Sequence, residues 1–93
     1  MDKLKELYEE AWEELEGAEK YAKQAAMYKD KHPTLSKMFH DMSGQEMMHS
    51  EAIMAEAEKL AGGMEHGKPM HDIFKQMHAN WASKIKALHA QYR

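Results

Sequence analysis

Residues 34–61 read TLSKMFHDMSGQEMMHSEAIMAEAEKLA, and more than half of these residues are Ala, Glu, Lys, Met or Leu, which have high helix propensity. Pro33 precedes the stretch and fits the first turn of a helix, where a missing N–H costs nothing. Gly62 and Gly63 follow it and fit the C′ position that ends a helix. The stretch therefore predicts one long α-helix over 34–61.

Two further stretches of similar composition lie on either side of this helix, and Pro33 and Pro69 mark the divisions. They predict helices over 3–31 and 69–92, and no alternating β-branched pattern suggests a strand. Because the connection at His32-Pro33 is short, we expect the first two helices to form an antiparallel hairpin. The sequence thus predicts an all-α fold, a helical hairpin plus a third helix, in a single domain over 1–93.

Length and composition exclude several classes of protein. The chain has 93 residues, a net charge of −3 and no cysteine, which excludes disulfide scaffolds, thiolate zinc sites and iron–sulfur clusters. Interspersed charges argue against nucleic-acid binding, and no apolar run or signal peptide points to a membrane. We expect a cytoplasmic protein. A chain this short buries only about 60% of its unfolded surface, so we also expect homo-oligomers.

Two carboxylates occupy positions at which a packed helix needs apolar residues. Because helical residues advance by about 100°, Glu14 shares its face with Leu7, Ala11, Ala18, Tyr21, Ala25 and Tyr28. Glu46 and His49 share theirs with Leu35, Phe39, Met42, Ile53, Ala57 and Leu60. Burying a carboxylate without a partner is costly, so these side chains require compensation.

A metal ion is the compensation that the spacing favours. Glu46 and His49 are three residues apart, which places a carboxylate and an imidazole on one face of a helix. Glu14 on the facing helix supplies a second carboxylate. Oxygen and nitrogen ligands without thiolate suit iron or manganese, and zinc is chemically acceptable too. The sequence therefore predicts Glu14, Glu46 and His49 as metal ligands.

Residues 13–21, EELEGAEKY, followed by Glu46-Met47-Met48-His49, resemble motifs of the ferritin-like superfamily. The chain is most similar to the encapsulated ferritins, whose protomer is a half-bundle, and the resemblance covers the first two helices. It implies that Glu14, Glu46 and His49 are ligands at a catalytic centre. It also implies that Tyr21, two turns after Glu14, is a catalytic hydrogen-bond partner of a ligand.

The same resemblance implies an assembly and an activity. Two chains would pair into a four-helix bundle and complete a di-iron site across the homodimer interface, because one chain carries half the ligand set. The family oxidises Fe(II) with oxygen or peroxide, so we expect a ferroxidase that uses iron. A shell protein that encloses it, and a location inside a protein compartment, are further implications.

Two other functions fit parts of the sequence. A metal-free helical interaction module would need Glu14 and Glu46 to be exposed or paired with lysine. A copper-binding helix is suggested by several thioether and imidazole side chains: Met38, Met42, Met47, Met48 and Met54, with His40 and His49. Of these methionines, Met47 and Met48 lie away from the apolar stripe and suit an oligomer contact.

The sequence of the third helix indicates that this helix packs against the other two and carries no metal ligand. Its apolar stripe comprises Met70, Phe74, Met77, Trp81, Ile85, Leu88 and Tyr92. We expect His71, His78 and His89 to flank this stripe, because the third helix offers no carboxylate beside them. We expect His40 and His66 to be solvated. Glu56, two turns beyond His49, is expected to be solvated, with an accessory role as a metal ligand as the alternative.

Overall fold

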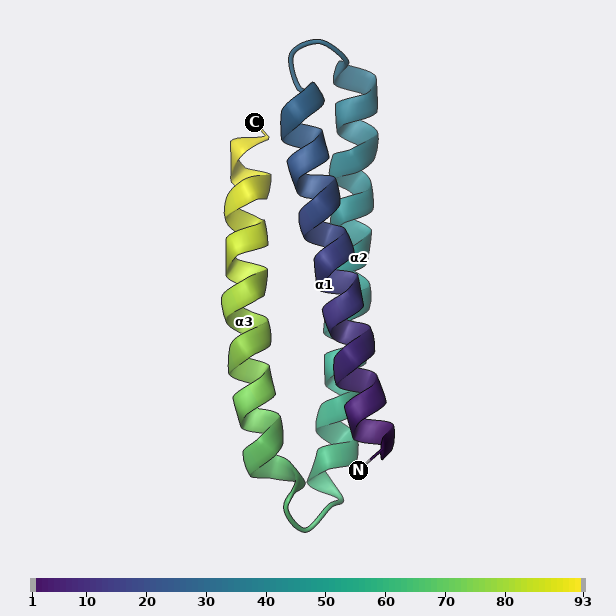
Figure 1. Ribbon diagram of the computed structural model, residues 1–93, viewed down its shortest axis with the longest axis vertical. Coiled ribbons are helices and arrows are strands. Elements are labelled where there is room, and N and C mark those ends of the chain that lie inside the picture. Colours follow the sequence, from purple (N-terminus) through teal and green to yellow (C-terminus); the bar gives the residue numbers. More distant parts are fainter. Residues whose placement is uncertain (1, 93) are drawn as a thin grey trace.

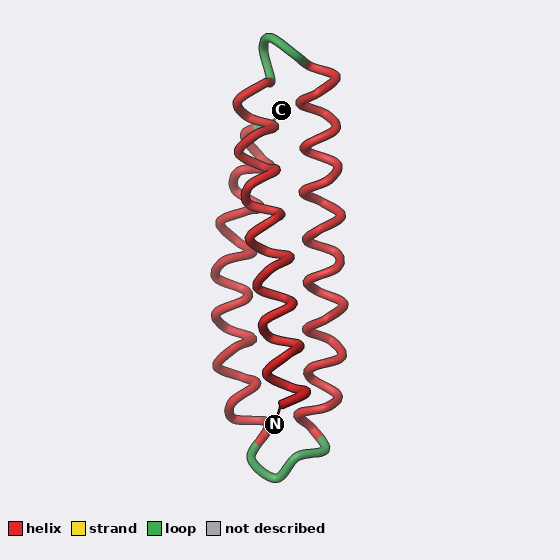
Figure 2. The backbone as a smooth tube through the Cα atoms, turned by 45° about the vertical axis from the view of Figure 1, so that its right-hand side comes forward, coloured by secondary structure: helices red, strands yellow, loops and turns green. Residues whose placement is uncertain are grey.

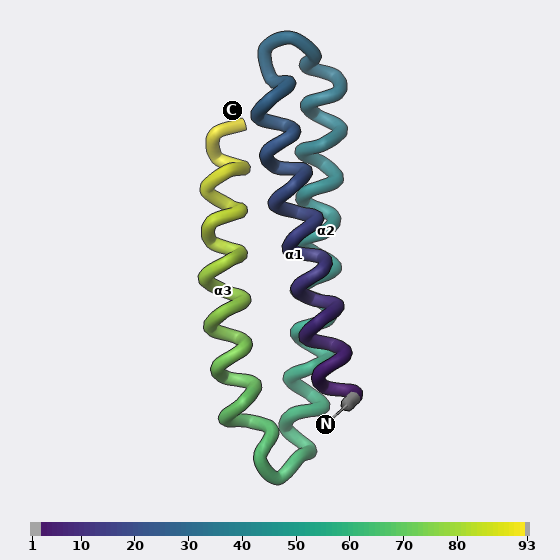
Figure 3. The backbone as a smooth tube through the Cα atoms, in the orientation of Figure 1, coloured from purple at the N-terminus to yellow at the C-terminus, as the bar shows by residue number. Residues whose placement is uncertain are grey.

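The computed structural model describes residues 2–92, which form three α-helices and no strand. These are α1 (Asp2–Tyr28), α2 (Pro33–Gly62) and α3 (Gly67–Gln91). They run up, down and up as a rod of 53 × 18 × 14 Å (Figures 1 and 2). The N-terminal end lies near the α2–α3 connection, and the C-terminal end lies near the α1–α2 turn (Figure 3). The predicted all-α fold of three helices is confirmed.

The helix ends differ from the predicted ones by up to three residues. α1 stops at Tyr28 instead of residue 31, because His32 precedes proline and adopts an extended φ of −137°. Gly62 is still helical, and Gly63 caps α2 with a right-handed φ of −89°. The two glycines end the helix as predicted, and the Gly63 N–H bonds to the Leu60 carbonyl and tightens the last turn. No helix within residues 2–92 is both long and apolar enough to cross a membrane.

Small residues spaced by seven positions form the contact between α1 and α2. Every member of the two series is buried: Leu4, the one large residue, with Ala11, Ala18 and Ala25 on α1, and Ser36, Ser43, Ser50 and Ala57 on α2. The Ser36 hydroxyl donates to the Ala25 carbonyl at 2.5 Å, and the Ser43 hydroxyl donates to the Ala18 carbonyl at 2.6 Å. A repeat of seven keeps one face towards a partner helix, and small side chains let the two backbones approach closely.

This packing corrects the predicted inner face of α2. Of the expected apolar stripe only Ala57 is buried, and Leu35 and Leu60 are each 36% exposed. The true core of α2 contains the serines together with Met47 and Met54. A prediction based on hydrophobicity places the larger apolar residues of α2 inside. Two helices that pack closely have room only for small residues between them, so the larger side chains lie at the edge of the α1–α2 contact.

The histidines of α3 are also placed differently from the prediction. His71 and His78 are buried and His89 is half-buried, because hydroxyl groups on the facing helices bind their rings. Three contacts form this set, in which Tyr8 Oη lies 2.8 Å from His71 Nδ1, Ser50 Oγ 2.5 Å from His78 Nε2 and Ser43 Oγ 2.7 Å from His89 Nε2. The expectation of flanking histidines was wrong.

Two smaller expectations about side-chain exposure were also wrong. His40 is half-buried, with its ring stacked on Tyr92 at a centroid distance of 4.1 Å. Met77 is 47% exposed and lies outside the apolar stripe that packs α3. The other predicted members Met70, Phe74, Trp81, Ile85 and Leu88 do pack in the core, and Ala82, which was not predicted, packs with them.

Candidate metal centre

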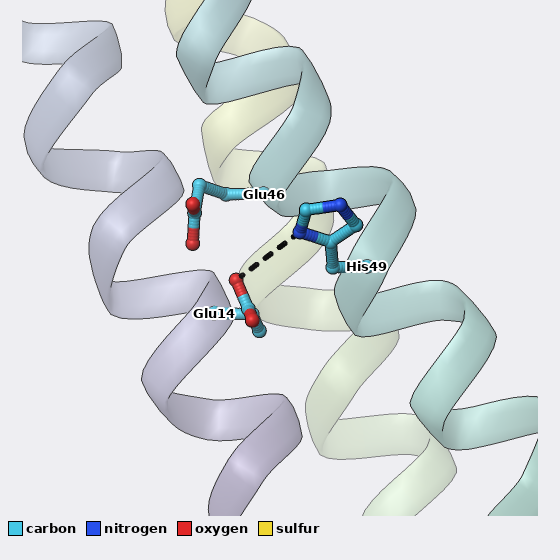
Figure 4. A group of neighbouring side chains, drawn as sticks. All are labelled: Glu14, Glu46 and His49. Atoms are coloured by element: carbon cyan, nitrogen blue, oxygen red, sulfur yellow. Dashed lines mark ion pairs between the residues drawn. The ribbon is translucent and has the colours of Figure 1, made fainter.

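Glu14, Glu46 and His49 lie together, about midway along the two helices that carry them. Glu14 projects from α1 towards α2, and Glu46 projects from α2 towards α1 (Figure 4). One ligand atom from each of the three residues lies within 4.8 Å of the other two. The three residues predicted as ligands are thus neighbours in space. Their role as ligands stays a prediction.

The cluster lies on the side of the hairpin that α3 leaves uncovered, because α3 runs behind α2 and the space between α1 and α2 (Figure 4). We call this side the open face. Its aliphatic and aromatic members are half-buried or exposed, because no third helix within residues 2–92 covers them. The open face comprises Leu7, Glu14, Tyr21 and Tyr28 of α1, and Leu35, Phe39, Met42, Glu46, His49, Ile53 and Leu60 of α2.

The two carboxylates are close enough to change each other's protonation. A hydrogen bond with the Glu14 side chain raises the pKa of Glu46 above its ordinary 4.5, and burial and the Glu14 charge raise it further. His49 opposes this pKa shift only weakly. The carboxylate of Glu46 therefore holds a proton more firmly than an isolated glutamate would, as expected for like charges that share a small space.

His49 approaches the other side of the same carboxylate pair. Its Nδ1 atom lies 3.7 Å from Glu14 Oε2, which is an ion-pair distance when the ring is protonated. The side chain of His49 is 62% exposed and that of Glu14 is 27% exposed. The cluster thus lies at the solvent-facing edge of the hairpin contact and outside its buried seam, whereas the sequence placed both glutamates within the apolar stripe.

The geometry suits a divalent cation with oxygen and nitrogen ligands. Bonds of about 2.0–2.2 Å put ligand atoms on one ion about 3–4 Å apart, so side-chain movements of about 1 Å would close the present arrangement. A cation between Glu14 and Glu46 would offset the repulsion between the two carboxylates. Neither carboxylate has a lysine partner in the described part of the chain.

Tyr21 and Glu56 lie away from the ligand atoms. The ring of Tyr21 stacks on Phe39 at 6.0 Å, and no hydrogen bond among residues 2–92 links its hydroxyl to the cluster. Its catalytic role stays a prediction. Glu56 is exposed and pairs with Lys59 at 3.4 Å, as expected for a solvated charge.

The methionines of α2 do not gather into a thioether site. Met54 packs in the hydrophobic cluster with Leu4 and Tyr8, whereas Met47 packs in a second cluster with Leu15 and Ile85. Met38 and Met48 are 45% and 68% exposed. Buried methionines fill irregular space in cores. Met47 is therefore a core residue, contrary to the suggestion of an oligomer contact, while Met48 does face outwards.

The serine and histidine contacts between the helices were missed by the sequence reasoning, although a signal was present. Ser36, Ser43 and Ser50 are spaced by seven residues, as are Ala11, Ala18 and Ala25. Read together, these two spacings would have predicted the α1–α2 seam and placed Glu14 and Glu46 at its edge.

Comparisons with family models, with curated proteins and with solved structures found no match to this chain, so its functional assignment depends on the residues and geometry described above.

Proposed function

We propose that this chain is a ferroxidase that oxidises Fe(II) at a di-iron site completed by a second copy of itself. Glu14, Glu46 and His49 from each chain would hold the two ions. The observation that carries the proposal is the convergence of these three side chains, within 4.8 Å, on the open face. The resemblance of residues 13–21 and 46–49 to ferritin-like motifs supports the same assignment.

The apolar surroundings of the cluster support a second copy as the partner. Phe39 and Ile53 lie one heptad to either side of Glu46, and Leu60 extends the row along α2. Three ligands from one chain leave an ion incompletely coordinated, whereas two chains related by a two-fold axis supply four carboxylates and two imidazoles. Four negative charges balance two Fe(II) ions. Pairing would also cover the open face, which lowers the free energy of association.

The roles of the residues follow from their charge. Protons and Fe(II) would compete for the Glu46 carboxylate, whose pKa is raised, so the affinity for iron should decrease as the pH is lowered. His49 would bind the ion through a ring nitrogen of its neutral imidazole. Since Fe(II) is the substrate, O2 or peroxide would accept its electrons. The same three side chains could also bind manganese or zinc without an oxidation reaction.

The test combines metal content, oxidation and mass in solution. Purified wild-type protein loaded anaerobically with Fe(II) should hold about one iron per chain, consume O2 on exposure to air and dimerise more tightly than protein treated with a chelator. Glu46→Ala should abolish these properties. Glu56→Ala, which removes an exposed carboxylate from the same helix, should leave them unchanged.

Two results would contradict the proposal. Iron oxidation by Glu46→Ala at the wild-type rate would show that the site is elsewhere. A stable dimer that binds no metal and does not dissociate in the presence of a chelator would favour the alternative function, a metal-free helical interaction module. In that case the apolar side chains of the open face would suffice for association.

A further inference from the structure

Gly17 lies inside α1, one turn after Glu14, at a position where glycine weakens a helix relative to alanine. Its surroundings explain why a side chain is absent. A Cβ atom added at Gly17 would lie 3.1 Å from Glu46 Oε2 and 3.6 Å from Glu46 Cδ. The carboxylate of Glu46 therefore lies close to the space that a methyl group would fill.

The second glycine within the hairpin provides a comparison. Gly44 also lies inside a helix, two residues before Glu46, yet a Cβ atom added there would meet nothing within 4 Å. Its neighbours would accept alanine without moving. Of these two glycines, only Gly17 thus lies next to a predicted metal ligand, Glu46.

We propose that Gly17 is a positioning residue for Glu46. Its missing side chain lets the Glu46 carboxylate approach α1 beside Glu14, so the two carboxylates converge on one point. An alanine would require Glu46 Oε2 to move by a few tenths of an ångström and would change its position relative to Glu14. Its consequence for metal binding rests on the proposed function above, whereas the steric relation between Gly17 and Glu46 does not.

The steric relation is tested by thermal unfolding of chelator-treated protein. Gly44→Ala should raise the melting temperature by about 4–8 °C, the shift expected when a helix-interior glycine is replaced in a domain of this size. Gly17→Ala should raise it less, because the methyl group meets Glu46. In a Glu46→Ala background, Gly17→Ala should give the full increase, and Gly44→Ala should give the same increase in both backgrounds.

The consequence for the site is tested with Co(II), which suits the same ligands and gives a visible spectrum. Gly17→Ala should weaken Co(II) binding about tenfold, in line with other changes that misplace a ligand, and should alter the Co(II) spectrum. Gly44→Ala should bind Co(II) with the affinity and spectrum of the wild type.

Each outcome decides between the two proposals. Equal increases in melting temperature for Gly17→Ala with and without Glu46 would overturn the role of Gly17, as would wild-type Co(II) binding by Gly17→Ala. A wild-type protein that binds no Co(II) while the melting temperatures show the predicted coupling would overturn the metal site and retain the steric role of Gly17.

Discussion

At the scale of single residues, the charge state of Glu46 is the most informative property of the molecule. The hydrogen bond to Glu14, burial and the Glu14 charge all raise the pKa of its carboxyl group, so the metal-free hairpin incurs an electrostatic cost when the two carboxylates ionise together. Groups with a raised pKa stabilise a fold below their unfolded pKa, and that stabilisation is lost as the pH rises through the folded pKa. The repulsion between Glu14 and Glu46 should therefore lower the free energy of unfolding of the metal-free protein slightly at neutral pH.

Glu46→Gln tests this repulsion directly. The amide keeps the shape and hydrogen-bonding capacity of a protonated glutamate and cannot ionise. We expect the variant to raise the free energy of unfolding of metal-free protein at pH 7 by less than about 1 kcal/mol, because solvent screens the pair. Urea unfolding in the presence of a chelator measures this change.

The pH dependence of the effect identifies its cause. Near pH 4, where wild-type Glu46 is protonated, the gain from Glu46→Gln should disappear. Glu56→Gln removes an exposed carboxylate and should change stability little at either pH. An equal gain at pH 4 and pH 7 would mean that the repulsion between Glu14 and Glu46 is not the cause.

At the scale of helices, the close contact between α1 and α2 controls which side chains are inside. Ala18 is fully buried against Ser43, which donates its proton to the Ala18 carbonyl. His89 Nε2 must then be the donor to the Ser43 hydroxyl, so this contact joins all three helices. Space at this junction is limited.

Ala18→Leu tests the closeness of this contact. The larger side chain cannot fit between the backbones, so we expect the free energy of unfolding to fall by about 1–3 kcal/mol. Ala26→Leu makes the same change at an exposed position of α1. Its free energy of unfolding should differ from that of the wild type by less than about 0.5 kcal/mol. Urea unfolding curves for the two variants provide the comparison. A tolerated leucine at 18 would refute the close seam.

Two histidines make the docking of α3 sensitive to acid. Burial lowers the pKa of His78, with Glu51 opposing and Lys86 adding to the shift, and burial and nearby His40 lower the pKa of His89. The folded chain therefore binds fewer protons than the unfolded chain below the ordinary imidazole pKa of 6.5.

Stability should consequently fall as the pH drops from 7.5 to 5.5, by on the order of 1 kcal/mol for the two residues together. The near-ultraviolet circular dichroism of Trp81, whose Nε1 donates to Glu19 at 3.1 Å, should report the loss of α3 packing. The double variant His78→Gln/His89→Gln should lose most of this pH dependence. An unchanged pH profile in that variant would assign the effect to other groups.

The sequence predicted the helices well and their faces less well. Propensity and the positions of Pro33 and Pro69 were sufficient for three helices, because local preferences act within each element. The inner face of α2 was misplaced because serines satisfied by carbonyls behave as core residues. The candidate ligands were identified together because Glu46 and His49 are one turn apart and Glu14 stands among apolar neighbours, whereas Tyr21 depends on contacts that spacing alone does not determine.

At the scale of the whole molecule, the open face is the surface through which two copies would associate. Leu35 and Leu60 lie near its two ends, and each is 36% exposed, so charges at these positions should cost little folding free energy. The double variant Leu35→Lys/Leu60→Lys should shift the iron-loaded protein from dimer to monomer in sedimentation equilibrium. Buried like charges would face each other across the two-fold axis.

A matched change on α3 controls for the effect of added charge. Ile73 and Met77 are 63% and 47% exposed and lie outside the open face, so Ile73→Lys/Met77→Lys should leave the dimer intact. If both double variants dissociate equally, charge alone is responsible. If neither dissociates, the copies meet through another surface.

The position of the ligand cluster, halfway along a 53 Å rod, has a geometric consequence for such a pair. Because a two-fold axis through the cluster bisects both rods, two antiparallel copies overlap over their full length and leave no overhang. A cluster near one tip would instead produce a staggered pair in which part of each open face stays exposed to solvent. The central placement would therefore let each copy cover the whole open face of the other in a closed two-fold pair.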